Sequence, residues 1–134
     1  MKRLNYFLLT ILCMAFLTKA SAQSFAGNDI VGLWFNEEKD AKIEIFQEGN
    51  TFNGKIVWLD EEVDPDTGKA KTDKNNPEPG LRSRPTLGLQ ILNDFEYDED
   101  GLWEDGSIYD PKSGKTYKCK ITMEEINSLY VRGY

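Results

Sequence analysis

One tight turn in the stretch 101–121 is followed by a strict alternation of apolar and polar side chains. This pattern constrains the fold of the chain more than any other feature. After the turn, apolar side chains share one face of the segment, and polar ones share the other: Tyr117, Cys119, Ile121 and Met123 against Thr116, Lys118, Lys120 and Thr122. In the turn, Asp110 and Pro111 favour the opening positions and Gly114 the left-handed position. A period of two is that of a strand with one buried face. The segment therefore predicts an antiparallel β-hairpin.

The same period recurs along most of the chain. The expected strands cover residues 30–35, 42–47, 52–59 and 87–97, the two arms of the hairpin, and 129–134. Gly88 and Asn93-Asp94 can divide the segment 87–97, which brings the count to about eight, and Gly54 indicates a bend or bulge in its strand. No segment carries a useful apolar stripe at helical spacing. We therefore predict an all-β fold, an antiparallel meander that closes into a barrel.

The first 22 residues are organised like a secretory signal peptide. Residues 2–3 are basic, residues 4–17 are mainly apolar, and small residues at 20–22 suit cleavage after Ala22. A membrane anchor fits less well, because the apolar run is shorter than the roughly 20 residues that a spanning helix needs. A lipoprotein signal at Cys13 fits less well too. We expect a periplasmic or secreted protein without an integral membrane anchor.

The remainder, residues 23–134, is expected to form a single domain with a strong acidic balance. It contains 23 acidic and 13 basic residues, a net charge of −10. Such a chain repels phosphate backbones and anionic lipid surfaces, so we expect no nucleic-acid partner. Cys119 is the only cysteine in this part, which excludes an internal disulfide, and its apolar neighbours predict a small buried side chain.

The absence of histidine from the sequence limits the chemistry of this chain. It removes Ser-His-Asp triads, Cys-His pairs, the usual zinc ligand sets and the commonest general base. No phosphate-binding loop or dinucleotide fingerprint is present. The segment 96–101 approaches a calcium loop, but Ser107 stands where the bidentate Glu belongs, so we interpret it as a hairpin turn. We expect a non-enzyme without cofactor or metal.

Paired carboxylates are the remaining route to catalysis, by glycoside hydrolysis. The available residues are Asp60, Glu61, Glu62, Asp64, Glu104, Asp105 and Asp110. In so acidic a chain, neighbouring carboxylates are expected without any function. A hydrolase is therefore the least favoured of the functions considered.

The alternation breaks between residues 60 and 85, in a segment rich in acidic residues, lysines and prolines. A connection this long inside a small domain is either functional or mobile, so it is the best place to look for a site. Arg82 and Arg84 flank Ser83 and could clamp a carboxylate or phosphate. The favoured alternative is that they neutralise the acidic residues of this segment.

Aromatic side chains are numerous enough to line an apolar cavity. With the two arginines, the candidate ligand-binding residues are Trp34, Trp58, Arg82, Arg84, Trp103, Tyr109 and Tyr117. An eight-stranded barrel is wide enough either to fill with side chains or to hold one small ligand. One hypothesis is a carrier of a small apolar or amphipathic molecule. The alternative is a cell-envelope structural or interaction protein with a filled barrel, which recognises a partner through residues 60–85.

Seven segments of the chain, in this order, resemble a known family. They are Gly32-Leu33-Trp34, Asn53–Val57, Asp73–Pro77, Leu81–Pro85, Gly88 with Ile91-Leu92, Gly106–Pro111 with Gly114–Tyr117, and Val131–Tyr134. The chain is similar to the bacterial domain of unknown function 2147 (DUF2147), small exported proteins with a lipocalin-like β-barrel. The resemblance implies a lipocalin- or calycin-like fold and export, but no activity.

The resemblance has one departure, at the C-terminal side. Members of this family usually continue past the segment that matches Val131–Tyr134 into a further strand, which this sequence lacks. The resemblance thus implies either a truncated sequence or a barrel that closes differently. We expect a barrel that is incomplete at this side, with an open strand edge.

Overall fold

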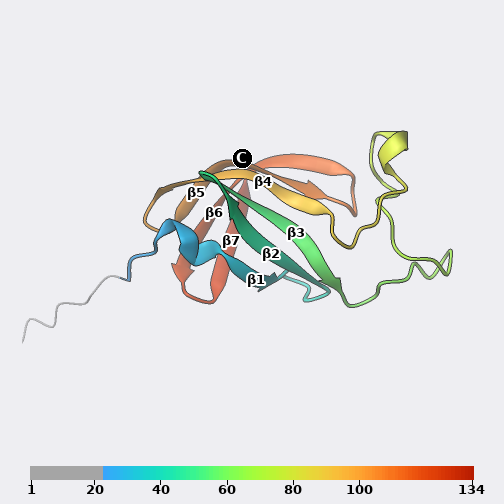
Figure 1. Ribbon diagram of the computed structural model, residues 1–134, viewed down its shortest axis with the longest axis horizontal. Coiled ribbons are helices and arrows are strands. Elements are labelled where there is room, and N and C mark those ends of the chain that lie inside the picture. Colours follow the sequence, from blue (N-terminus) through green and yellow to red (C-terminus); the bar gives the residue numbers. More distant parts are fainter. Residues whose placement is uncertain (1–22) are drawn as a thin grey trace, which may run out of the picture.

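Seven antiparallel strands follow one another around a single curled sheet in the computed structural model, which describes residues 23–134 (Figure 1). The strands are β1 (Gly32–Phe35), β2 (Ala41–Glu48), β3 (Thr51–Leu59), β4 (Gln90–Glu99), β5 (Leu102–Asp110), β6 (Lys115–Glu125) and β7 (Ser128–Gly133). Two short 3-10 helices accompany them, η1 (Gly27–Ile30) and η2 (Pro79–Leu81). The predicted signal peptide, residues 1–22, lies outside the described residues.

Each strand pairs with the next one in sequence, so the sheet is the antiparallel meander that the alternation predicts. Within residues 23–134 the sheet is open, with β1 and β7 at its edges, and it forms a half-barrel as the resemblance implies. Seven strands are present in this part where about eight were expected, because the segment 87–97 is not divided. Gly88 lies in the preceding loop, at φ 89°, and β4 begins at Gln90.

The hairpin predicted from the alternation is formed by β5 and β6. The backbone N–H of Lys112 donates a hydrogen bond to Asp110 Oδ1 over 3.0 Å, and Gly114 has φ 72°. The apolar face of β6 is buried from Cys119 onward. Tyr117 is 45% exposed, because the pairing of β6 with β7 begins only at Cys119.

A β-bulge corrects one prediction for β3. The alternation placed Trp58 on the same face as Ile56, but the register shifts between Lys42 and Ile43 of β2. Ile56 pairs with Ile43 and is buried, whereas Trp58 pairs with Lys42. A slip of one residue exchanges the two faces of a strand, so Trp58 turns to the outer face.

The bend that was predicted at Gly54 is also present, and it coincides with irregular pairing between β3 and β4. A Cβ atom at this position would lie 2.8 Å from Leu92 Cδ1 and 3.0 Å from Ile43 Cγ2. Glycine therefore allows these two side chains to close over the curved sheet.

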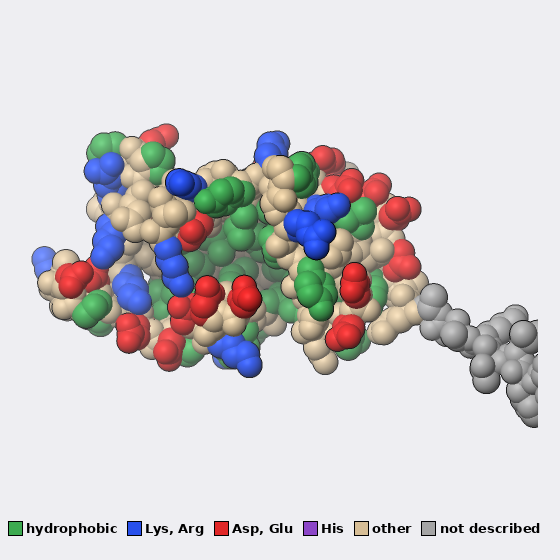
Figure 2. Space-filling model, turned by 180° about the vertical axis from the view of Figure 1, so that it is seen from behind, with side chains coloured by type: hydrophobic (Ala, Val, Ile, Leu, Met, Phe, Trp, Pro, Cys, Tyr) green, Lys and Arg blue, Asp and Glu red, His purple; other side chains and the backbone are tan. Residues whose placement is uncertain are grey.

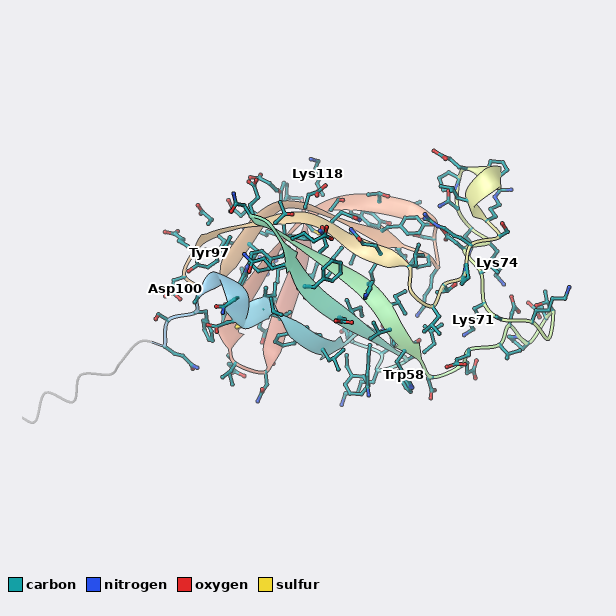
Figure 3. The ribbon with its side chains drawn as sticks, viewed as in Figure 1. Trp58, Lys71, Lys74, Tyr97, Asp100 and Lys118 are labelled. Carbon is teal, nitrogen blue, oxygen red and sulfur yellow. The ribbon has the colours of Figure 1, made fainter. Side chains whose placement is uncertain are left out.

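The segment that contains η1 crosses one end of the half-barrel and closes it (Figure 1). The N–H of Phe25 donates to Asp100 Oδ1 over 2.7 Å, and the hydroxyl of Tyr97 donates to the carbonyl of Phe25 over 2.8 Å. Trp103 Nε1 donates to the carbonyl of Gly27 over 3.1 Å. Figure 3 shows Tyr97 and Asp100 beside this segment. We refer to this end of the half-barrel as the closed end.

The core of the closed end is filled with side chains. Its buried members include Ile30, Ile45, Phe52, Phe95, Trp103, Cys119, Ile121 and Met123. Cys119 is fully buried, as predicted, and burial raises the pKa of its thiol to about 11. Apolar packing thus accounts for this half of the fold. No helix within residues 23–134 is long and apolar enough to cross a membrane.

Candidate functional site

A cavity of about 830 Å³ lies at the end of the strands opposite to η1. It opens to solvent between the sheet, the loop 60–89 and the β5–β6 turn. Figure 2 shows this face hollowed, with hydrophobic side chains on the floor and charged side chains at the edge. The floor is formed by inward residues of the strands: Ala41, Ile43, Ile56, Leu59, Ile91 and Ile108. The half-barrel is therefore filled at the closed end and hollow at this one, which we call the open end.

The loop 60–89 forms one wall of the cavity and is held by a buried carboxylate, Asp73. Its Oδ1 accepts a hydrogen bond from the Tyr109 hydroxyl over 2.6 Å. Its Oδ2 accepts bonds from Asn76 Nδ2 over 2.8 Å and from Arg84 Nε over 2.9 Å. We call these four residues the Asp73 cluster. Tyr109 belongs to β5 and the others to the loop, so the cluster joins the loop to the sheet.

The charge state of the cluster follows from its contacts. Burial alone would raise the pKa of Asp73, but hydrogen bonds from Tyr109, Asn76 and Arg84, with the guanidinium charge, outweigh burial and lower it. Burial and the hydrogen bond to Asp73 raise the pKa of Tyr109 above its ordinary value of 10.0. At neutral pH, Asp73 is therefore ionised and Tyr109 is a neutral donor.

A second attachment joins the loop to the β5–β6 turn. Asn75 Nδ2 donates to the carbonyls of Pro111 and Lys112, over 3.2 Å and 3.0 Å. Gly114 approaches the backbone carbonyl of Asn75 so closely that a Cβ atom would overlap with it. The turn and the loop thus pack together along one side of the open end.

Charged side chains surround the mouth of the cavity. Three ion pairs are formed there: Lys71–Glu61 at 3.9 Å, Lys74–Asp64 at 2.9 Å and Lys112–Asp40 at 3.2 Å. Figure 3 shows Lys71 and Lys74 on the loop. The hydrogen bond from Lys74 lowers the pKa of Asp64, so this carboxylate is ionised at neutral pH.

The seven candidate binding residues do not gather at one place. Tyr109 lines the cavity, whereas Trp103 is fully buried at the closed end. Trp34 is half-buried, and its Nε1 donates to the carbonyl of Ile30 over 2.8 Å. Trp58 lies on the outer face of the sheet, where it stacks edge-to-face with Phe35, and Tyr117 is exposed.

The two arginines serve the loop itself. Arg84 forms an ion pair with Asp73 at 2.9 Å, and Arg82 Nε donates to the carbonyl of Asn76 over 2.7 Å. Arg84 thus neutralises a carboxylate of the segment 60–85, in line with the favoured alternative, and both side chains stabilise the loop. The loop also contributes to the cavity wall, and it was the segment expected to carry a site.

Two parts of the site were missed in the sequence. Most of the cavity floor is aliphatic, so a search for aromatic residues could not find it. The inward positions of β2 and β3, Ile43 and Ile56, were its available signal. The role of Asp73 depends on contacts with Asn76, Arg84 and Tyr109. Tyr109 is 36 residues from Asp73 in the sequence, so no local sequence pattern marks their contact.

The described part of the chain offers no obvious metal site. No group of three or more Cys, Asp or Glu side chains within residues 23–134 is placed to hold a metal ion. Residues 96–99 of the calcium-loop-like segment end β4, and Asp100 and Gly101, with Gly101 at φ 69°, form the β4–β5 hairpin turn. It is a turn, as interpreted from the sequence.

Comparison with known proteins supports the architecture. Residues 32–134 match the family model described as "Uncharacterized protein conserved in bacteria (DUF2147)". Among solved structures, a Helicobacter pylori protein described as belonging to the lipocalin family is similar, with 28% sequence identity and a TM-score of 0.57. The similarity covers 68% of this chain and 59% of that protein, so this chain spans less than two thirds of its length. No curated protein matches the sequence.

Proposed function

Since this chain belongs to the bacterial family DUF2147 and has a lipocalin-like fold, we propose that it is an exported, non-enzymatic protein that binds a small apolar or amphipathic molecule at its open end. The signal-peptide pattern of residues 1–22 supports export. The lipocalin-like neighbour supports small-ligand binding by analogy of fold.

The observation that carries this proposal is the cavity. Its volume of about 830 Å³ lies within the range of roughly 300–1,000 Å³ that is typical of small-molecule sites. Its aliphatic floor attracts an apolar chain, because each buried methylene gains about 0.8 kcal/mol. An alkyl tail of ten carbons would gain about 8 kcal/mol before the cost of ordering the ligand is subtracted.

The charged rim supports binding of a polar head group more than catalysis. Three of its carboxylates are engaged in ion pairs with lysines. The sequence also lacks histidine, the commonest general base. A ligand with an apolar tail and a polar end would match both the floor and the rim.

Native mass spectrometry tests the proposal directly. The mature protein, purified from its own host without detergent, is expected to carry an extra mass that is lost on denaturation. The control is Ile108→Trp, which adds a bulky side chain to the cavity floor, and it should carry the bare chain mass. A bare mass for the folded wild-type protein, together with no binding of added decyl amphiphiles, would contradict the proposal.

A second candidate function is recognition of a protein partner by the loop 60–89. It is supported by the exposure of three apolar side chains on this loop, Val63, Leu81 and Leu87. Changing all three to Ser should abolish partner capture from the envelope and leave the fold intact. Capture that persists in this variant would count against the loop as the recognition element.

A further inference from the structure

We propose that the cavity selects amphiphiles with a cationic head group, such as a long-chain amine, over neutral or anionic ones with the same tail. This inference rests on the proposed ligand-binding function and names its ligand class. The cavity provides the site, and the charge of its rim determines which head group it accepts.

Acidic side chains outnumber basic ones at the rim of the cavity. Seven carboxylates line the cavity: Glu38, Asp40, Asp60, Glu61, Asp64, Asp66 and Asp110. Only three lysines line it, Lys71, Lys74 and Lys112, and each is already paired with one of these carboxylates. Among residues 23–134, no ion pair neutralises the four others, Glu38, Asp60, Asp66 and Asp110.

These four carboxylates come from three segments around the mouth. Glu38 belongs to the β1–β2 turn, Asp60 and Asp66 belong to the loop, and Asp110 ends β5. Asp110 also accepts hydrogen bonds within its own turn, from Lys112 N and Ser113 Oγ. A head group at the mouth therefore meets negative charge from several sides while its tail lies on the floor.

The physical chemistry favours an organic cation over the alternatives. A metal ion is a poor match, because no group of three or more Cys, Asp or Glu side chains within the described residues is placed to hold one. A metal ion would also leave the apolar floor without an occupant. An anionic head group would meet the unpaired carboxylates or would have to displace a carboxylate from its lysine. Exposed charges act weakly one at a time, so the preference arises from their sum.

Three ligands with one tail test the inference: decylammonium, decan-1-ol and decanoate. Each is titrated calorimetrically into the mature protein, the two ions below their micelle concentrations and decan-1-ol below its solubility limit. We expect decylammonium to bind about tenfold more tightly than decan-1-ol, and decanoate to bind more weakly than either. Raising the salt concentration from about 50 to 500 mM should weaken decylammonium alone, since salt screens exposed charges.

Charge-matched variants locate the effect. The triple variant Glu38→Gln, Asp60→Asn, Asp66→Asn should lose most of the preference for decylammonium and keep its affinity for decan-1-ol. The control variant Glu96→Gln, Asp98→Asn, Glu99→Gln changes the net charge equally on exposed residues of β4, and it should behave like the wild type. Ile108→Trp should abolish the binding of all three ligands, because the larger side chain occupies the cavity itself.

The outcomes separate the two proposals. If all three ligands bind with equal affinity, or if decanoate binds best, the inference of a cationic ligand is overturned and the ligand-binding function stands. The inference is also overturned if the control variant reduces the preference as much as the rim variant does. If none of the three ligands binds the folded protein and the protein purified from its host carries only the bare chain mass, the proposed function itself fails.

Discussion

Asp73 is the residue on which the arrangement of the open end depends most directly. Its side chain is fully buried and accepts hydrogen bonds from Tyr109, Asn76 and Arg84. A buried carboxylate costs free energy unless it is paired and hydrogen-bonded, and here those requirements are met by both the loop and the sheet. Docking of the loop on the sheet completes the cluster, because Tyr109 is its only member outside the loop.

Removing one hydroxyl from the cluster should show how much it contributes. Tyr109→Phe keeps the ring but takes the donor from Asp73 Oδ1, which leaves a buried acceptor unsatisfied. We expect a loss of about 1–3 kcal/mol in the free energy of unfolding, measured by urea denaturation. The matched control is Tyr117→Phe, because the side chain of Tyr117 is exposed. This variant should change the free energy of unfolding by less than about 0.5 kcal/mol. Equal effects of the two variants would contradict the role of the cluster.

The lowered pKa of Asp73 predicts a dependence of stability on pH. A carboxyl whose pKa is lower in the folded state stabilises the fold above its unfolded pKa, and this contribution is lost as pH falls through the folded value. The ordinary value is 3.8, so the loss should begin near pH 4 and continue below it. The difference in unfolding free energy between the wild type and Asp73→Asn should therefore be constant from pH 5 to 7 and shrink below pH 4. A difference that stays constant down to pH 2.5 would show that Asp73 does not titrate in this way.

At the scale of elements, the loop 60–89 and the β5–β6 turn behave as one unit. The sequence predicted this turn from Asp110 and Gly114, and it predicted that the segment 60–85 departs from the strand pattern. It did not predict that the two would touch. That contact depends on Asn75, which donates to two carbonyls of the turn, and on the missing side chain of Gly114.

Two glycines with nearly equal φ angles allow the cost of backbone strain to be measured separately from the cost of steric overlap. Gly114 has φ 72° and Gly68 has φ 69°, but a Cβ atom would overlap with Asn75 only at Gly114, and it would meet nothing at Gly68. Gly68→Ala should cost about 1–2 kcal/mol of unfolding free energy from the left-handed backbone alone. Gly114→Ala should cost more and should raise amide hydrogen exchange at Asp73 and Thr86, which bond within the loop. If both variants leave this exchange unchanged, the turn does not hold the loop.

The predictability of each strand depended on the regularity of its pairing. Period-two alternation located the buried residues of β2 and those of β6 from Cys119 onward, because these stretches keep one face inward. It failed at Trp58, because the β-bulge opposite Lys42 shifts the register and the sequence has no mark of it. The bend at Gly54 was predicted, because glycine in a strand signals a place where side chains close over the backbone.

At the scale of the whole molecule, the interior of the half-barrel is packed with side chains in one half and hollow in the other. The sequence was compatible with both a filled core and a ligand cavity, because composition does not show at which end of the barrel the large side chains pack. The tryptophans were expected to line a cavity, yet Trp103 fills the closed end, where η1 covers it. The open end is instead lined by aliphatic residues and by the loop, which depends on the Asp73 cluster for its position.

This division predicts that replacing an isoleucine with tryptophan has different effects on stability at the two ends. Ile108 of β5 lines the cavity and is half-buried, whereas Ile121 of β6 is almost fully buried in the packed half. Overpacking a filled core typically costs about 1–3 kcal/mol, so Ile121→Trp should lower the free energy of unfolding by at least this much. Ile108→Trp has empty volume beside it and should change the free energy by less than about 1 kcal/mol while abolishing decylammonium binding. Urea denaturation and calorimetry of the two variants provide both readouts. Equal destabilisation would mean that the open end is packed in solution, and retained binding in Ile108→Trp would place the ligand outside the cavity.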